Sequence, residues 1–298
     1  MKKNTAPLAI LYYHHDVLVP ERNHAFDTQR WLYRSRLGSA VRTVLKTHIA
    51  ARCAGWFHNT HASRHLIASF IEEYRICITD FVVPPGGYKS FNDFFIRALQ
   101  PDVRPMPDNQ DLPVSPADGK LFVINHITPT CPFFVKELPF DLVSFLGNDA
   151  HAQSLNNGTL CMFRLAPYDY HRFHTPCDGT IEKIIRIAGT LESVNPIAFM
   201  AGKQPLTSNE RIVIMYKTQT HGTIAIVAVG ALFVGSITLT KKQGEQVHRG
   251  DELGYFAFGG STVVVIFPAH SISPKELFLR HSLQGYETAV TIGTAITD

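Results

Sequence analysis

The sequence has few cysteines, and none of them form a pair with a recognisable spacing. There are five, an odd number without a C-x-x-C motif: Cys53, Cys77, Cys131, Cys161 and Cys177. A disulfide framework needs paired cysteines, and cysteine-based zinc sites show closely spaced ones. The sequence therefore predicts free thiols and favours a reducing, cytoplasmic setting.

Long apolar runs are also missing. The only candidate for a membrane span, residues 223–236, is too short for a bilayer. Gly230 and Gly235 interrupt it among β-branched residues, a composition typical of buried strands. Residues 8–13 form a short apolar run that ends at two histidines and Asp16, so no signal peptide is predicted.

Acidic residues are absent from Gln29 to Ile71. The formal net charge of the whole chain is only +3, which gives no reason to expect a nucleic-acid partner. This one stretch nevertheless holds both tryptophans, Trp31 and Trp56, and seven basic side chains: Arg30, Arg34, Arg36, Arg42, Lys46, Arg52 and Arg64. An unbalanced basic stretch with tryptophans is typical of segments that lie on anionic membranes, and also of ordinary solvated surface helices.

Helical periodicity runs through the same region. Tyr33, Leu37 and Val44 recur at helical spacing, with Arg42 and Lys46 on the opposite side. Residues 66–74 repeat the pattern, and Pro-Pro-Gly-Gly at 84–87 ends the region as a linker. We therefore expect residues 1–85 to form a basic, amphipathic helical region that docks on a membrane.

Beyond the linker, short apolar runs alternate with turn residues. The expected strands cover residues 120–127, 160–165, 179–187, 212–217, 223–229, 231–239, 254–258 and 262–267, and the expected short helices cover 91–99 and 142–146. A G-x-x-V-x-x-G-D-x-L turn at 244–253 resembles the hairpin of biotinyl- and lipoyl-type barrels. The predicted fold class is α+β, mainly β: residues 86–298 form a barrel- or sandwich-like β core, biotinyl/lipoyl-barrel-like, beside the N-terminal helical region.

Three motifs combine into a candidate catalytic site. They are SPADGK at 115–120, RLAPYDYHRFHTP at 164–176 and GGST at 259–262. Singly, each is typical of an ordinary turn or a structural histidine. Together they offer Asp118, His174 and Ser261, and a histidine backed by an aspartate can deprotonate a serine in any fold and any chain order. Because two glycines precede the serine, little bulk shields the Gly260 carbonyl.

These motifs resemble those of the phosphatidylserine decarboxylases. FNDFFIRAL at 91–99, Arg104-Pro105, SVNP at 193–196, NER at 209–211 and VGA at 229–231 extend the resemblance in the family's order. One departure is Gly259, where many bacterial members carry leucine; the Gly260–Ser261 junction is kept. The first 85 residues match only in general character.

The resemblance implies a self-processing enzyme that converts phosphatidylserine to phosphatidylethanolamine and carbon dioxide. His174, oriented by Asp118, would deprotonate Ser261, which attacks the Gly260 carbonyl. The cut would give a β chain of residues 1–260 and an α chain of 261–298 that begins with a pyruvoyl cofactor derived from Ser261. Its ketone would form a Schiff base with the amine of the substrate. His171 is the candidate for the proton step of decarboxylation.

Partners and location follow from the same resemblance. The substrate lies in the membrane, so we expect a peripheral protein on the cytoplasmic face of a bacterial-type cell membrane. The resemblance implies an α/β heterodimer, and a dimer of these heterodimers is common in the family. Arg97, Arg172 and Arg211 are candidate anion-binding residues because they lie in family motifs.

Three alternatives compete with this interpretation. A zinc hydrolase could use His171, His174 and Asp118, or the cluster His58, His61 and His65, but the chain has no H-E-x-x-H motif and we expect no metal. A carrier module would need an exposed lysine at the hairpin near Val247, and Lys241 and Lys242 lie outside the expected turn. An inactive relative of the family would keep the fold without the chemistry.

Overall fold

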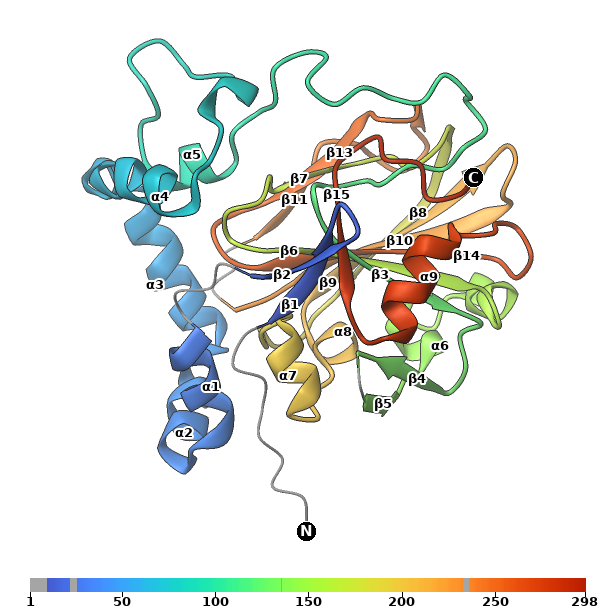
Figure 1. The fold of residues 1–298 in the computed structure, drawn as a ribbon, viewed down its shortest axis with the longest axis horizontal. Helices are drawn as coiled ribbons and strands as arrows, with labels where there is room; N and C mark the ends of the chain where they lie inside the picture. Colours follow the sequence, from blue (N-terminus) through green and yellow to red (C-terminus); the bar gives the residue numbers. More distant parts are fainter. Residues whose placement is uncertain (1–9, 22–25, 135, 233–235) are drawn as a thin grey trace.

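A ten-stranded sheet runs through the centre of the molecule in the computed structural model (Figure 1). The structure describes residues 10–21, 26–134, 136–232 and 236–298. The strand order of this sheet is β12-β8-β9-β10-β14-β6-β3-β15-β1-β2. Its strands are β1 (Leu11–His14), β2 (Val17–Pro20), β3 (Gly119–Asn125), β6 (Thr159–Leu165), β8 (Gly179–Ile187), β9 (Arg211–Thr218), β10 (Thr223–Gly230), β12 (Gln246–Val247), β14 (Ser261–Phe267) and β15 (Glu287–Val290).

The central strands are apolar on both faces, and this decides the layering. In β14, Val263, Val265 and Phe267 belong to one core cluster, whereas Val264 and Ile266 belong to another. Successive side chains of a strand point to opposite faces, so the two clusters lie on opposite faces of the sheet. A sheet with two buried faces needs a covering layer on each of them.

A small sheet covers the first face. Its order is β11-β13-β7, with β7 at Arg172–His174, β11 at Ile237–Leu239 and β13 at Glu252–Phe256. Phe173, Leu253 and Phe256 from this sheet join the first core cluster.

The second face is covered by a hairpin and three short helices. These are β4 (Thr130–Phe133), β5 (Lys136–Pro139), α6 (Leu142–Phe145), α7 (Pro196–Met200) and α8 (Pro205–Ser208). Phe133, Phe145 and Phe199 from this layer join the second core cluster.

The predicted α+β class is confirmed, but the described sheet is not a closed barrel. Its order ends at β12 on one edge and at β2 on the other. The burial of both faces explains the difference, because layers on each side replace curling of the sheet onto itself. In the expected hairpin at 244–253, Gly244 and Gly250 have φ of 87° and 88°, which favour glycine.

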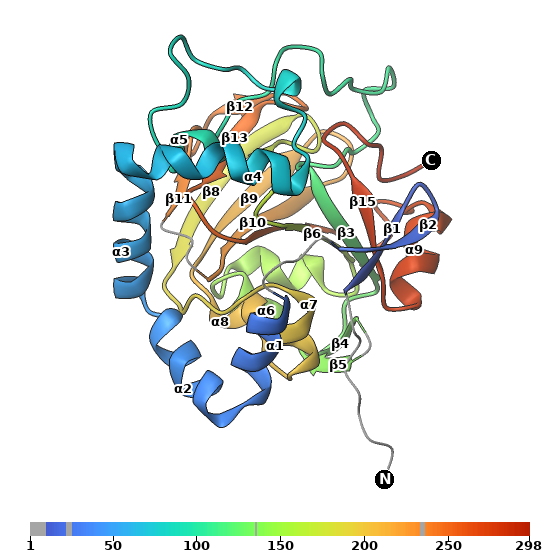
Figure 2. The same cartoon turned by 60° about the vertical axis from the view of Figure 1, so that its left-hand side comes forward.

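The remaining helices lie mainly along one side of the sheets (Figures 1 and 2). They are α1 (Phe26–Arg34), α2 (Arg36–Leu45), α3 (His48–Asn59), α4 (Leu66–Tyr74) and α5 (Phe91–Phe95), while α9 (Glu276–Leu283) packs near β3 and β15. The side chains of Ser35 and Thr47 cap α2 and α3, which separates the helical stretch into short segments. Most of the predicted strands are confirmed within a few residues, but in the described part of the strand predicted at 231–239 only β11 at Ile237–Leu239 forms, and the helix predicted at 91–99 ends at Phe95. Residues 1–9, 22–25 and 233–235 of the predicted regions lie outside the described residues.

Helix α2 turns Arg42 toward the protein interior and Leu37 and Val44 toward solvent, which is the reverse of the predicted orientation. Arg42 is only 6% exposed and is paired with Glu192, whose carboxylate also accepts a hydrogen bond from Tyr33. Leu37 and Val44 are instead 68% and 65% exposed. Arg42 faces inward because a buried carboxylate compensates its charge, so it is not free to contact a lipid surface.

The first hairpin, β1 and β2, was not expected. Strand β1 pairs in parallel with β15, so segments near the two ends of the chain lie side by side close to one edge of the sheet. Glu21, just after β2, and Glu287 of β15 both pair with the buried Arg164. Buried ions are retained only when paired, so this triad fixes the hairpin against the sheet.

Candidate active site

Ser261 lies at the start of the central strand β14 and is completely buried. Its backbone is opposite Gly230 of β10 on one side and Leu165 of β6 on the other. A strand with partners on both sides has little freedom, so the position of Ser261 is fixed by the sheet. Gly259, two residues earlier, has φ 139°, a conformation that L-residues rarely adopt.

His171 lies directly beside this serine. Its Nδ1 is 3.2 Å from Ser261 Oγ, and its Nε2 is 3.0 Å from the carbonyl oxygen of Ala166. A carbonyl only accepts, so Nε2 carries the proton, and Nδ1 accepts from the serine hydroxyl. Burial, and then the positive charge of Arg97, lowers the pKa of His171 to about 3, so its ring is neutral near pH 7.

The segment that carries His171 is held by a buried ion pair. Lys120 Nζ lies 2.6 Å and 2.9 Å from the two carboxylate oxygens of Asp169. Asp169 also accepts a hydrogen bond from the Ala166 backbone at 2.7 Å. The ring of Phe95 stacks on His171 with centroids 4.0 Å apart. These contacts fix both the backbone and the ring plane of the histidine.

His174 lies on β7 and has different partners. Its Nδ1 donates to the Gly250 carbonyl at 2.8 Å, and its Nε2 is 3.2 Å from the Tyr170 hydroxyl. Burial lowers the pKa of His174, while the Gly250 carbonyl and the charges of Glu252 and Asp118 oppose that shift. Among the described residues, no hydrogen bond joins His174 to Ser261 or to Asp118.

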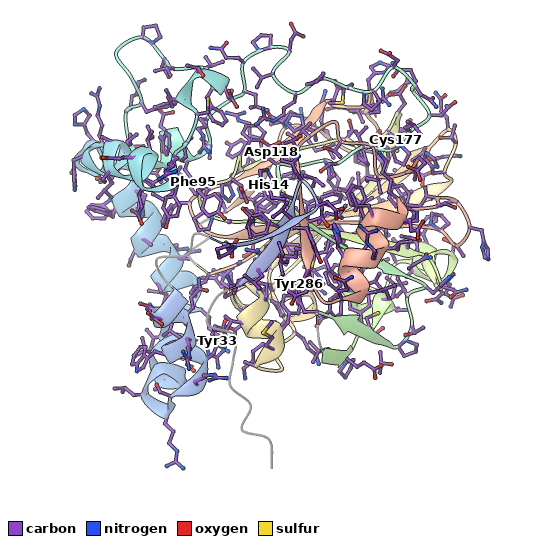
Figure 3. The ribbon with its side chains drawn as sticks, viewed as in Figure 1. His14, Tyr33, Phe95, Asp118, Cys177 and Tyr286 are labelled. Carbon is purple, nitrogen blue, oxygen red and sulfur yellow. The ribbon has the colours of Figure 1, made fainter. Side chains whose placement is uncertain are left out.

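Asp118 pairs with Arg104 and not with His174, the residue that it was expected to orient. Arg104 donates to both of its carboxylate oxygens, at 2.7 Å to Oδ2 and 3.2 Å to Oδ1, and the Ile292 backbone donates at 2.8 Å. In Figure 3, Asp118 is labelled in the upper centre of the view, and Phe95 lies to its left, toward the helices. Asp118 therefore lies within electrostatic range of His174 without orienting it directly.

The three arginines that were expected to bind substrate anions already have partners. Arg97 is buried and donates to the carbonyls of Tyr168 and Asp169. Arg211 is buried and donates only to backbone carbonyls. Arg172 is partly exposed and forms an ion pair with Glu252 at 2.9 Å.

The described residues offer no ligand set for the zinc alternative. No group of three or more histidine, cysteine, aspartate or glutamate side chains is arranged there to hold a metal ion. His58 stacks on Phe258, while His61 and His65 are exposed on the following turn. All five cysteines are free.

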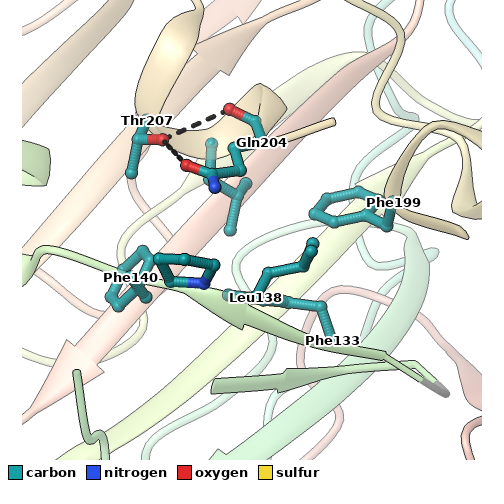
Figure 4. Close-up of a pocket in the computed structure, with 8 residues that line it drawn as sticks. Phe133, Leu138, Phe140, Phe199, Gln204 and Thr207 are labelled. Carbon is teal, nitrogen blue, oxygen red and sulfur yellow. Dashed lines mark hydrogen bonds between the residues drawn. The ribbon is translucent and has the colours of Figure 1, made fainter. Parts of the chain in front are cut away.

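A small cavity lies elsewhere, between β5 and α8 (Figure 4). Its volume is about 10 Å³, and Phe133, Leu138, Phe199 and Thr207 are among its lining residues. That volume holds one water molecule at most. None of the candidate site residues lines this cavity.

Sequence reasoning missed the supporting residues of the site. Arg104 and Lys120 stand within quoted motifs, yet nothing in the local sequence pairs them with Asp118 and Asp169. Asn209 was also missed: its side chain donates to the carbonyls of Glu192 and Gly230, and so braces the strand beside Ser261. Their place in the quoted motifs is the one signal that could have identified them. Their partners are distant in sequence, so no local spacing indicates the pairing.

The site is thus a buried serine beside a neutral histidine, directly after a glycine. This arrangement is typical of sites in which a serine hydroxyl acts as a nucleophile toward a carbonyl. Residues 91–293 match the phosphatidylserine decarboxylase family. A protein of Chlamydia trachomatis serovar L2 named phosphatidylserine decarboxylase proenzyme is 39% identical over 268 residues, which cover 90% of this chain and 89% of that protein.

Eukaryotic relatives show the same similarity over part of their length. Phosphatidylserine decarboxylase proenzyme 2 of Oryza sativa subsp. japonica is 37% identical over 276 residues, which are 89% of this chain and 44% of that protein. Phosphatidylserine decarboxylase proenzyme 3 of Schizosaccharomyces pombe is 38% identical over 261 residues, which are 87% of this chain and 27% of that protein. The chain belongs to the phosphatidylserine decarboxylase family.

Proposed function

We propose that this enzyme decarboxylates phosphatidylserine to phosphatidylethanolamine after cutting its own chain between Gly260 and Ser261. The observation that carries the proposal is the 3.2 Å contact between Ser261 Oγ and His171 Nδ1, with Ser261 completely buried directly after Gly260. A hydrogen bond to an unprotonated imidazole fixes the orientation of the hydroxyl for attack on a neighbouring carbonyl.

The cleavage is redox-neutral. The Ser261 oxygen bonds to the Gly260 carbonyl carbon, its proton passes to a base, and the peptide C–N bond breaks as the Ser261 nitrogen gains a proton. β-Elimination then removes the Cα proton of residue 261 and releases the Gly260 carboxylate, leaving dehydroalanine. Water hydrolyses its imine tautomer to a ketone and ammonia, so no oxidant is required.

The two histidines have different environments, which supports different roles. A base with a pKa of about 3 holds a proton poorly near neutral pH, so we propose that His171 orients the hydroxyl of the precursor and does not deprotonate it. His171 is also our candidate for the proton step of decarboxylation, because its ring lies beside the side chain of residue 261. His174 is proposed as the base of the cleavage: burial lowers its pKa, and the Gly250 carbonyl and the carboxylates of Glu252 and Asp118 act against that shift. This role requires the His174 ring to leave Tyr170 and reach Ser261.

The surroundings of Ser261 fit a pyruvoyl group at this position. The backbone is fixed between two strands, and the His171 ring lies beside the side chain. Such a group supplies the electron sink for the electrons left behind when carbon dioxide departs. Before cleavage, the surrounding residues keep Ser261 away from solvent and hold the His171 imidazole beside its Oγ.

The two products of cleavage are proposed to remain together as a heterodimer. In the α chain, β14 lies between β10 and β6, and β15 lies between β3 and β1. Separation would break backbone hydrogen bonds on both sides of two strands and expose the core residues of β14. Arg172 is our candidate for the headgroup anion, because it is more exposed than Arg97 and Arg211.

Residues 1–85 are proposed to dock on the cytoplasmic face of an anionic cell membrane. The described part of this region presents apolar side chains to solvent, with Ile49 and Trp56 of α3 both 73% exposed. Fully burying such a side chain contributes about 1.5–3 kcal/mol, and each nearby basic residue about 1 kcal/mol. None of the described helices is long and apolar enough to span a membrane.

A denaturing gel combined with mass spectrometry tests the cleavage. The purified wild-type chain is expected as two pieces, with a ketone in place of the amino group at residue 261. Ser261→Ala should remain a single 33.3 kDa chain. An intact wild-type chain that turns over phosphatidylserine would refute the proposed chemistry.

Flotation with phosphatidylserine-containing vesicles tests docking. Ile49→Ser combined with Trp56→Ser should weaken binding at least tenfold, since two apolar anchors are lost. Leu283→Ser is the matched control, because Leu283 is 85% exposed but lies on α9, away from α3 (Figure 1). Equal binding of both variants and wild type would contradict docking through α3.

A further inference from the structure

The segment just before the cleavage junction is clamped by helices far away in sequence. The Phe258 ring stacks on His58 of α3, with centroids 3.8 Å apart and planes at 23°. Phe91 and Phe95 of α5 contact the same ring edge-on, at centroid distances of 5.4 Å and 5.3 Å. His58 is itself fixed, because its Nδ1 donates to the Ala54 carbonyl at 2.7 Å.

A chain of amide hydrogen bonds holds the backbone of the same residue. The Phe258 N–H donates to Asn92 Oδ1 at 3.0 Å, and Asn92 Nδ2 donates to Asn59 Oδ1 at 3.0 Å. Asn59 Nδ2 donates in turn to the Gly55 carbonyl at 2.8 Å. Each amide uses its oxygen and its nitrogen in a defined direction, so the orientation of Asn92 is set by α3.

These contacts of Phe258 with His58, Asn92, Phe91 and Phe95, here called the clamp, hold the residue that directly precedes two glycines. Gly259 and Gly260 have no side chains to pack, and glycine has the largest conformational freedom of any residue. An ideal Cβ on Gly260 would meet only Val194, at 4.0 Å, so the surroundings do not restrain this residue closely. The Gly260 carbonyl is therefore positioned by what holds the two ends of the segment, which are Phe258 and Ser261.

We propose that His58 and Asn92 are positioning residues for self-cleavage, which anchor Phe258 so that the Gly260 carbonyl is presented to Ser261 Oγ. The proposal rests on the proposed cleavage at Gly260–Ser261. Attack within a chain is fast only when the reacting atoms are held close in the correct orientation, so loosening one end of a diglycine slows it. After the cut, the same contacts keep the new end of the β chain on α3 and α5.

Helix α3 also connects the helical region to the cleavage junction. Helix α3 carries the exposed Ile49 and Trp56 on one side and ends in His58 and Asn59, which reach the clamp. A chain without its helices would therefore lose fast cleavage as well as lipid binding. Point variants separate the two effects, and a truncation does not.

The test follows cleavage of the full chain after pulse labelling in cell-free translation. Asn92→Ala and His58→Ala should each slow cleavage about tenfold, the effect of losing one hydrogen bond or ring contact of ordinary strength. Asn92→Asp keeps the acceptor for Phe258, and His58→Phe keeps the ring, so both should recover most of the wild-type rate. His65→Ala, an exposed histidine outside the clamp, is the matched control.

Two further measurements separate positioning from general stability. In a Ser261→Ala background, which stays uncut, Asn92→Ala and Asn92→Asp should melt within a few degrees of each other. Decarboxylation is measured per cleaved chain with dispersed short-chain phosphatidylserine and should stay within about twofold of wild type. The reason is that His58 and Asn92 are proposed to act on the intramolecular attack, which is complete once the chain has been cut.

The outcomes are distinct. Wild-type cleavage rates in both alanine variants would overturn the clamp, as would rates that follow the melting temperature without rescue by Asn92→Asp or His58→Phe. A wild-type chain that is never cut would instead refute the proposed function on which the inference rests.

Discussion

The buried neutral state of His171 makes the stability of the precursor depend on pH in a defined direction. In the unfolded chain this imidazole takes up a proton below its ordinary pKa of about 6.5. In the folded chain burial holds the pKa at about 3. Between these values the unfolded state binds more protons, so stability falls as the pH is lowered from about 6.5 toward 3.

The magnitude follows from the same two values. At pH 5 the folded form is still unprotonated while the unfolded form is mostly protonated, which costs about 2 kcal/mol relative to pH 7. The assay is urea unfolding at pH 7 and pH 5 in the Ser261→Ala background, where one uncut chain is measured. Because other histidines titrate as well, the same measurement on Ser261→Ala combined with His171→Gln isolates the contribution of His171.

The expected result is a loss between pH 7 and pH 5 that is about 2 kcal/mol larger with His171 than with glutamine at this position. Equal losses in the two proteins, within about 0.5 kcal/mol, would refute the reasoning. The imidazole would then carry an ordinary pKa in the folded precursor.

Three other outcomes follow from the structure. Glu192→Gln leaves the buried Arg42 without its counter-charge and should destabilise the uncut Ser261→Ala precursor by about 3–5 kcal/mol in urea unfolding; an unchanged midpoint would contradict the inward placement of Arg42. Gly259→Leu should destabilise the same precursor by about 1–3 kcal/mol because φ is 139° there, whereas Gly260→Ala should be nearly neutral, and the reverse order would be inconsistent with this backbone. The two chains of the cleaved enzyme should co-elute in native gel filtration and separate only in denaturant, and early loss of the small chain would show that β14 does not lie in the centre of the sheet.

The β core illustrates what could be predicted and why. Continuous apolar runs such as 262–267 predict buried strands, and β14 at Ser261–Phe267 confirms this. The prediction succeeds because the apolar side chains of a strand themselves favour its burial. Closure into a barrel was not predictable in the same way. It depends on which strands meet at the edges, and the parallel pairing of β1 with β15 joins segments more than 270 residues apart.

The candidate site shows the same division. The motifs identified Ser261, Gly260 and the two histidines as a group, and the structure brings His171 and Ser261 into contact. The individual roles of His171, His174 and Asp118 remain predictions, since spacing along a chain does not determine which ring nitrogen reaches which oxygen. Arg104 became the partner of Asp118 only once the chain had folded.

By itself, the sequence determined the local elements, the family and the glycine–serine junction, because periodicity and motifs are properties of neighbouring residues. Only the tertiary structure decided that Arg42 turns inward to Glu192, that Leu37 faces solvent, and that His58 and Asn92 hold Phe258. The physical reason is that the energy of a charge or a polar group depends on its partner and its burial. Those partners come from distant parts of the chain, so no local pattern specifies them.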